Sequence, residues 1–315
     1  MIRTMERNIV VLMATYNGEK YIKEQLDSIF LQKLLPGDKL TLFVRDDGSK
    51  DATLDIVNGY SKNNDIIILE DAEKKIGPAR SFWRLLKAAQ DYDYYFFSDQ
   101  DDIWDEDKVQ NALTEASHYN GPFLYTSNNR KIDENGCCTK KRSATKMPVY
   151  DLQSVLVSSF AQGCSMMCNE EARKIALLQD EKYIPMHDLA LLVSTIICGS
   201  VVYDLEPRFS HRIHMNNADA INKRNNNIVR LQKSIKKWVD RSTQTPLDQY
   251  VADILQNYGT YISERKCYEI LSYMANYKRS ITDKIRLLKW IVFENKYNSR
   301  NCKFNFACRI VLNLL

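Results

Sequence analysis

The chain of 315 residues lacks any long uninterrupted apolar run. Its most apolar late pieces, LLKWIVF and ACRIVLNLL, fall short of the roughly 18 residues that a membrane-spanning helix needs. The N-terminus has basic residues but only the short apolar run Ile9–Ala14, which predicts neither a signal peptide nor a membrane anchor. No transmembrane segment is therefore expected.

The spacing of a zinc site is also missing. The eight cysteines include the neighbours Cys137 and Cys138, but none forms a CxxC motif or a Cys/His cluster. In a chain without a secretory signal, such cysteines are expected to be reduced thiols. The sequence therefore predicts a protein of the cytoplasm.

Glycine-rich phosphate loops are absent as well. Neither GxGxxG nor GxxxxGK[ST] follows the first apolar run, so Rossmann dehydrogenases and P-loop enzymes lose their main support. A sugar-phosphate nucleotidyltransferase would need a glycine-rich, basic loop at the same place. The segment ATYNGEKYIKEQ is a poor version of such a loop.

Charge is unevenly distributed, although the net charge is only +4. Residues 223–315 hold 18 Lys and Arg against 7 Asp and Glu, and residues 1–222 hold 26 against 33. Residues 228–239 have apolar side chains at helical spacing between basic ones, which is typical of a helix on an anionic membrane. The same helix could pack on the rest of the protein or form an oligomer contact. Nucleic acid is not an expected partner, because no binding motif appears.

Apolar runs and segments of helical periodicity alternate through the first hundred residues. The runs lie in the segments NIVVLMATYNG, KLTLFVRDDGSKD, DIIILED and YDYYFFSDQDD. This pattern predicts an α/β fold with a mostly parallel central sheet flanked by helices. The alternation loosens after residue 120, where a strand is expected at 122–133 and another with its polar end at Pro207. The basic part beyond residue 222 reads as helical.

Polar residues collect where the predicted strands end. Ligands of such sheets bind in the crevice beyond the carboxyl ends of the strands. One crevice is therefore expected to gather Thr15, Asn17, Asp46, Asp47, Asp99, Asp101 and Asp102.

The stretch YYFFSDQDDIW poses an electrostatic problem, because a buried aromatic strand leads directly into three carboxylates. A solvated acidic turn is the simplest interpretation of an isolated Asp pair, and an ordinary Asp-Gly turn explains DDGSKD alone. Together, at the ends of central strands, the acids favour a hard divalent cation that carries diphosphate oxygens. Trp104 is interpreted as a core aromatic that closes the crevice.

Several segments resemble a known family. ATYNGEKYIKEQLDSIFLQ, RDDGSKDAT, IGPARSFWRLL and FFSDQDDIWDEDKV look like the successive signatures of family 2 glycosyltransferases, which have the GT-A fold. SDQDDIW, with MHDLALLV and HRIHMNNA downstream, is similar to the bacterial rhamnosyltransferase-like branch that builds capsule, cell-wall and O-antigen polysaccharides. The resemblance covers residues 7–220. It implies a catalytic domain over residues 1–221, while the pattern of the residues predicts a basic helical extension over residues 222–315.

The resemblance also implies roles for individual residues. Asp46 would hydrogen-bond a pyrimidine base, and Asp101 would be the main ligand of Mn²⁺ or Mg²⁺, supported by Asp102. The donor-binding set is Thr15, Tyr16, Asn17, Asp46, Asp47, Arg80 and Asp99, and the metal set is Asp101, Asp99 and His214. Asp188, in MHDL, would be the general base that deprotonates the acceptor hydroxyl, with Gly163 and His187 on the acceptor side.

Simpler structural roles remain open for some of these residues. Asp188 could cap the helix that follows it, and His187 could do the same. His214 could be a structural histidine, because the glycine that often follows it in the family is Met215 here. The family often has Asn before the glycine of its third helix, where this chain has Lys75 and Ile76.

The expected function is an inverting, metal-dependent transfer of one sugar from a nucleoside diphosphate. A dTDP- or UDP-sugar is the expected donor, with rhamnose as a candidate, and the acceptor would be a lipid-linked saccharide presented at the inner face of the cell membrane. The alternatives are a sugar-phosphate nucleotidyltransferase and a non-catalytic nucleotide-sugar-binding protein. Intact Asp101 and Asp188 argue against the latter.

Overall fold

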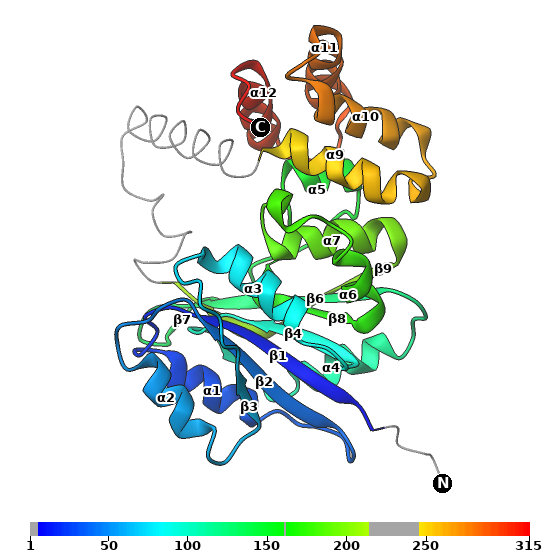
Figure 1. The fold of residues 1–315 in the computed structure, drawn as a ribbon. Coiled ribbons are helices and arrows are strands. Elements are labelled where there is room, and N and C mark those ends of the chain that lie inside the picture. The colour runs from blue at the N-terminus through cyan, green and yellow to red at the C-terminus, as the bar shows by residue number, and fades with distance from the viewer. Residues whose placement is uncertain (1–5, 161, 214–245) are drawn as a thin grey trace. The chain divides into compact units, whose positions relative to one another are not determined.

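The computed structural model describes residues 6–160, 162–213 and 246–315 (Figure 1). By the contacts between residues, the chain divides into two units. The first comprises residues 6–147, 162–175 and 199–213, and the second comprises residues 148–160, 176–198 and 246–315. Two segments that precede residue 221 group with the C-terminal helices in this division, and the domain boundary at residue 221 stays a prediction.

The first half of the first unit alternates strands and helices as the sequence predicts. Its elements are β1 (Asn8–Thr15), α1 (Ile22–Phe30), β2 (Lys39–Asp46), α2 (Thr53–Tyr60), β3 (Ile66–Ile68), α3 (Gly77–Ala88) and β4 (Tyr94–Ser98). The four strands lie in the order β3-β2-β1-β4 and are all parallel. Their carboxyl ends therefore meet at one edge of the sheet.

The rest of the sheet is mixed. It contains β5 (Ile103–Trp104), α4 (Lys108–Ala116), β6 (Phe123–Ile132), β7 (Cys138–Lys140), η1 (Gly163–Ser165), β8 (Met166–Asn169), α6 (Glu170–Ala176) and β9 (Ser200–Arg212). β8 is antiparallel to β4 and β6, β6 is parallel to β9, and β5 is antiparallel to β9. The strand predicted to end at Pro207 continues to Arg212, which brings its last residues to the acidic turn after β4.

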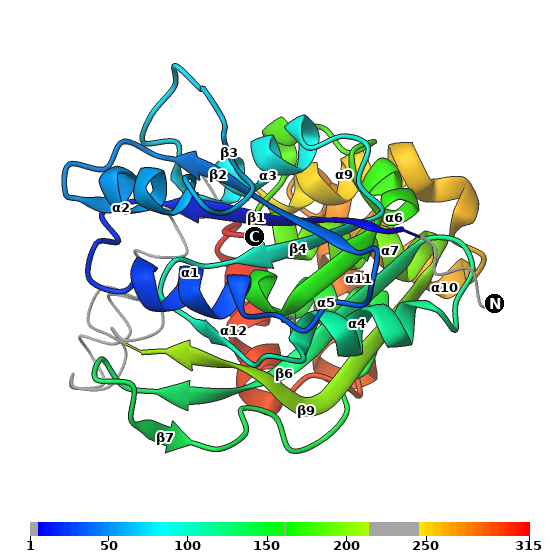
Figure 2. The ribbon, with the colours of Figure 1, turned by 90° about the horizontal axis from the view of Figure 1, so that it is seen from below.

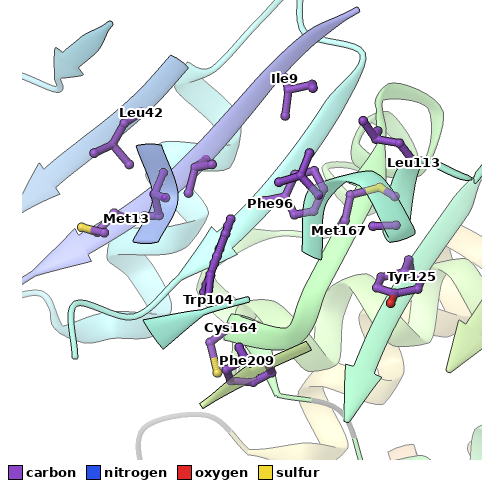
Figure 3. Packing of buried hydrophobic residues seen from close by; sticks show 14 of the residues in the cluster. Ile9, Met13, Leu42, Phe96, Trp104, Leu113, Tyr125, Cys164, Met167 and Phe209 are labelled. Carbon is purple, nitrogen blue, oxygen red and sulfur yellow. The ribbon is translucent and has the colours of Figure 1, made fainter. Parts of the chain in front are cut away.

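β1 is the centre of the packing, because Ile9 to Met13 have no solvent exposure. Ile9, Val11 and Met13 share one buried cluster with side chains of α1, α2 and α4, while α3 covers the other face of the sheet (Figures 1 and 2). Apolar residues on both faces are typical of a central parallel strand. Figure 3 shows this cluster, in which Trp104 lies between Phe96 and the side chains of Cys164 and Phe209. Trp104 is therefore a core aromatic, as predicted.

The described residues of the second unit form helices joined by loops, and none of them is in a strand. Its elements are α5 (Leu152–Val157), η2 (Glu181–Tyr183), α7 (His187–Cys198), α9 (Leu247–Tyr258), η4 (Gly259–Tyr261), α10 (Arg265–Asn276), α11 (Ile281–Lys289), η5 (Trp290–Glu294) and α12 (Arg300–Val311). The basic helix predicted at 228–239 lies outside the described residues. Among the helices that the structure does describe, none is both long and apolar enough to cross a membrane. All eight cysteines are described, and all are free thiols.

Candidate active site

The ends of β1 and β2 are joined by a buried hydrogen-bond network around Asp46. Thr15 lies opposite Asp46 in the sheet and donates its Oγ1 hydrogen to Oδ1 of Asp46 over 2.9 Å. The backbone N–H groups of Gly48 and Ser49 both donate to Oδ2 of Asp46 over 2.9 Å. Gly48 has a φ of +95°, which glycine adopts without strain. Asp46 thus fixes the loop that follows its own strand.

The loop after β1 is held by a residue that the sequence reading missed. Gln100 accepts a hydrogen bond from the backbone N–H of Tyr16 over 2.9 Å and donates its amide to the carbonyl of Tyr16 over 3.0 Å. A Cβ atom on Gly18 would lie 2.4 Å from Oε1 of Gln100, so only glycine leaves room for this side chain. The Tyr16 side chain itself is 47% exposed.

Asn17 connects the loops after β1 and β2. It has a positive φ of 47°, which asparagine tolerates better than most residues. Its N–H donates to Oγ of Ser49 over 2.9 Å, and its side-chain oxygen accepts from the N–H of Lys50 over 2.9 Å. With Gln100, these bonds hold the loops after β1, β2 and β4 in one arrangement.

Asp47 contacts the start of α3. Its carboxylate accepts from the Nη1 of Arg45 over 2.8 Å and from the backbone N–H groups of Ile76 and Gly77 over 3.0 and 2.9 Å. Burial favours the neutral acid, but these hydrogen bonds outweigh it and hold the pKa of Asp47 below its ordinary value. The predicted donor residue Asp47 therefore has a structural task of its own, at the N-terminus of α3. Arg80, one turn further along α3, is exposed.

The three carboxylates after β4 lie at different depths. Asp102 has no solvent exposure, whereas Asp99 and Asp101 are half-buried. Oδ1 of Asp102 accepts from the backbone N–H of Arg212 over 3.2 Å and lies 2.9 Å from Nδ1 of His211, while its Oδ2 has no hydrogen-bond partner among the described residues. Burial and the charges of Asp102 and Asp101 raise the pKa of Asp99 to about 7. Negative charge is therefore in excess at this turn.

Three buried cations offset part of this charge, and none was singled out from the sequence. Burial disfavours the charged form of His211, but its contact with Asp102 raises its pKa to about 9. Burial lowers the pKa of Lys108 to about 8, and its Nζ donates to the carbonyl of Cys164 over 2.6 Å and lies 3.9 Å from the centre of the Trp104 ring.

Arg212, at the end of β9, is the third of these cations. Its side chain is 1% exposed. Its Nε donates to the backbone carbonyl of Asp101 over 3.0 Å, and its Nη2 donates to Glu24 over 2.6 Å. Arg212 therefore positions the main chain of the acidic turn.

The acidic turn has the donor atoms for a divalent cation. Among the described residues, one group of potential ligand atoms lies within 4.8 Å of one another, and it consists of Asp99, Asp102, Cys164 and His211. Mn²⁺ and Mg²⁺ favour oxygen ligands, whereas burial raises the pKa of the Cys164 thiol well above its ordinary value and His211 is held as a cation by Asp102. The carboxylates, with the unpartnered oxygen of Asp102 and the raised pKa of Asp99, are thus the part that fits a hard cation. Asp101 is not in this group, and the predicted ligand His214 lies outside the described residues.

Gly163, predicted for the acceptor side, is buried in the first unit at the start of η1. It follows Gln162, whose side-chain oxygen accepts from Asn129 over 2.8 Å. Lys108 bonds the next residue, Cys164, so the buried cation and the Gly163 segment are directly connected.

The other two predicted catalytic-side residues belong to the second unit, in the first turn of α7. His187 is 3% exposed, and burial lowers its pKa to about 3, so its imidazole is neutral. Asp188 is half-buried, and its Oδ1 accepts from the N–H of Leu189 over 2.6 Å.

Known proteins are similar to this chain in sequence and in fold. The chain spans less than half the length of one curated relative, the dTDP-rhamnosyl transferase RfbG of Shigella flexneri, which is 43% identical over 120 residues, or 37% of this chain and 40% of RfbG. The putative teichuronic acid biosynthesis glycosyltransferase TuaG of Bacillus subtilis is 25% identical over 68% of this chain and 82% of its own.

Solved structures and a family model extend this likeness. The crystal structure of Staphylococcus aureus TarS in complex with UDP-GlcNAc superposes with a TM-score of 0.61 at 13% identity, over 98% of this chain and 82% of that chain, and so shows the GT-A fold. A family model described as glycosyl transferase family 2 matches residues 10–172, more than half of the chain. The protein therefore belongs to family 2 of the glycosyltransferases.

Proposed function

We propose that this protein transfers a sugar from a nucleoside-diphosphate donor to a saccharide acceptor, with inversion at the anomeric carbon. One observation carries the proposal: the parallel strands β1, β2 and β4 bring the Thr15–Asp46 pair and the acidic turn at Asp99–Asp102 to one edge of the sheet. Parallel α/β sheets bind nucleotides at this edge. Membership in family 2 supports the same reaction class.

Donor binding is assigned to the loops after β1 and β2. The exposed ring of Tyr16 would contact the base, while Asp46, already bonded to Thr15, would receive its N–H group. Asn17 holds these loops together, and Arg80 would approach the diphosphate from α3. RfbG is named as a dTDP-rhamnosyl transferase and TarS was crystallised with UDP-GlcNAc, so a dTDP- or UDP-sugar is the donor class we propose, with rhamnose as the first candidate.

A divalent cation, Mn²⁺ or Mg²⁺, would be held by Asp99 and Asp101, with Asp102 behind them. When bound, it would stabilise the negative charge of the departing diphosphate as a Lewis acid. The chain itself contributes the buried cations His211 and Lys108. Their positive charge reduces the repulsion among the carboxylates of the acidic turn. His214 completes the proposed set on the strength of the family resemblance alone.

Asp188 is proposed as the general base on the acceptor. Its carboxylate has one oxygen engaged with the N–H of Leu189, which fixes its orientation. The Asp188 carboxylate would take the proton of the acceptor hydroxyl as the hydroxyl oxygen attacks the anomeric carbon and the C–O bond to the diphosphate breaks. Gly163 and His187 are proposed for the acceptor side, His187 as a neutral side chain.

The acceptor is proposed to be a growing cell-surface polysaccharide on a lipid carrier. TuaG is named for teichuronic acid biosynthesis and TarS for poly(ribitol-phosphate) glycosylation, and both support an acceptor of this class. Such an acceptor is presented at a membrane, so we place the enzyme at the inner face of the cell membrane, in contact with anionic lipid. The eight free thiols fit a reducing compartment.

The test is a donor-hydrolysis screen over UDP-, dTDP- and GDP-sugars, with and without Mn²⁺. We expect metal-dependent release of nucleoside diphosphate from one donor class. A parallel assay with sugar phosphate and nucleoside triphosphate separates a nucleotidyltransferase, which would release pyrophosphate instead. Absence of metal-dependent release from every donor would contradict the proposal.

A further inference from the structure

One helical segment of the second unit is apolar on two sides. Leu287, Trp290 and Ile291 face the interior and are at most 4% exposed. Ile281, Ile285 and Val292 recur at helical spacing on another side, where they are 79%, 61% and 47% exposed. A helix that is apolar on both sides is normally covered on both. No described residue covers the second side.

The end of α12 extends this apolar side. Lys284 donates from Nζ to the carbonyl of Val311 over 3.1 Å and to Asn313 over 2.9 Å, so α11 and the end of α12 lie side by side. Val311 and Leu312 are 58% and 52% exposed there. We call these five side chains the apolar face: Ile281, Ile285, Val292, Val311 and Leu312.

The apolar face is set in basic surroundings. Residues 281–315 hold seven Lys and Arg against two acidic residues, Asp283 and Glu294. Both acids have a basic partner, since Asp283 lies 3.5 Å from Arg286 and Glu294 lies 3.1 Å from Lys266. Lys289 is exposed on α11 itself. Exposed apolar side chains among cations are the pattern of a surface that enters the headgroup layer of an anionic bilayer.

Charge also decides between a bilayer and a second copy of the chain. A symmetric dimer through the apolar face would bring two identical basic surfaces together, and like charges across an interface oppose association. An anionic bilayer both covers the apolar side chains and attracts the cations. We propose that the apolar face of α11, η5 and α12 docks on anionic phospholipid. The docking deepens the proposed function by holding the enzyme where a lipid-linked acceptor lies, but vesicle binding can be measured without any sugar transfer.

The experiment is co-sedimentation of the full chain with vesicles of phosphatidylcholine and phosphatidylglycerol. We expect the Ile285→Glu/Val292→Glu double variant to lose at least about tenfold in vesicle affinity, because two apolar side chains no longer enter the bilayer. Leu178→Glu is the matched control, since Leu178 is 58% exposed in the same unit outside the apolar face. It should bind as the unaltered chain does.

A charge variant gives a second, independent result. Lys289→Glu should weaken binding to the anionic vesicles by about fivefold or more, with little effect on vesicles of phosphatidylcholine alone. Far-ultraviolet circular dichroism establishes that each variant is folded. Donor hydrolysis in the absence of vesicles should be the same for all variants, so failure of the proposed function is seen separately from failure of docking. Unaltered vesicle binding by both variants, or a concentration-dependent dimer that the double variant abolishes, would overturn the proposal.

Discussion

Nδ1 of His211 lies 2.9 Å from Oδ1 of Asp102, and both side chains are buried. The contact joins the last residues of β9 to the turn after β4, across 109 residues of sequence. This contact explains how three carboxylates can follow a buried apolar strand. The Asp102 carboxylate points inward against the His211 cation, while Asp99 and Asp101 remain half-buried at the sheet edge. The site is therefore built on a buried ion pair rather than on a solvated acidic turn.

Replacement of His211 by Phe should destabilise the fold. It leaves the Asp102 carboxylate buried without its cation, which typically costs about 3–5 kcal/mol in the free energy of unfolding. Urea denaturation measures this change, with His118→Phe as the control, because His118 is exposed and lies just beyond the end of α4. Adding Asp102→Asn to His211→Phe should restore part of the loss, because the uncompensated charge is gone. An His211→Phe variant as stable as the control would contradict the pairing.

The Gln100–Gly18 relationship predicts a defect in donor binding with little loss of stability. Gly18→Ala places a Cβ where the Gln100 side chain lies, and this flexible side chain can move away. The two hydrogen bonds that hold Tyr16 are then lost. We expect Gly18→Ala and Gln100→Ala to raise the KM for the donor by a similar factor, about three- to tenfold for two lost bonds. The double variant should be no worse than either single one, and additive effects would show that the residues act separately.

The strand-end residues could be predicted because they depend on local pattern. Apolar runs that end in polar residues predicted which segments form β1, β2 and β4 and that these strands are parallel. Parallel strands align their carboxyl ends at one edge of the sheet. Thr15 and Asp46 accordingly meet as expected.

Long-range pairing could not be predicted in the same way. His211 reaches the acidic turn because β9 pairs with β5. Lys108 does so because the start of α4 is bonded to the Cys164 segment. Neither contact has a local signal in the sequence. His211 stood within the HRIHMNN motif but was passed over for His214. The contact of Gln100 with Tyr16 also depends on the geometry of two loops that are distant in sequence. From the sequence alone, a glutamine between aspartates has no evident role.

Asp101→Asn and Asp99→Asn should each impair the response to metal. A lost carboxylate oxygen weakens binding of a hard cation, and we expect the Mn²⁺ concentration for half-maximal donor hydrolysis to rise by at least about tenfold. Asp93→Asn is the control, because Asp93 precedes the other end of β4 and is exposed. An unchanged metal response in Asp101→Asn would exclude this residue as the main ligand.

Asp188→Asn distinguishes a base from a helix cap. Asparagine caps a helix about as well as aspartate, so a purely structural role predicts normal transfer. If Asp188 is the general base, the Asp188→Asn variant should have a kcat about 10²- to 10⁴-fold lower. Donor affinity, measured by calorimetry, should persist in the variant while sugar transfer collapses. Asp180→Asn, which alters the cap of η2 in the same unit, is the matched control.

Asp47 should make the stability of the protein depend on pH. The pKa of Asp47 is lower in the folded chain than in the unfolded one. Its contribution to the free energy of unfolding is therefore fully present above about pH 4, the ordinary pKa of a carboxyl group. This contribution is lost as the pH falls through the folded pKa, because the protonated acid no longer pairs with Arg45. Asp47→Asn should cost about 2–4 kcal/mol at neutral pH, and the difference from the unaltered protein should shrink in acid. Glu206→Gln, which removes the exposed salt bridge to Arg142, is the control and should change stability little. A stability difference that stays constant from neutral to acidic pH would show that the Asp47 charge does not hold the start of α3.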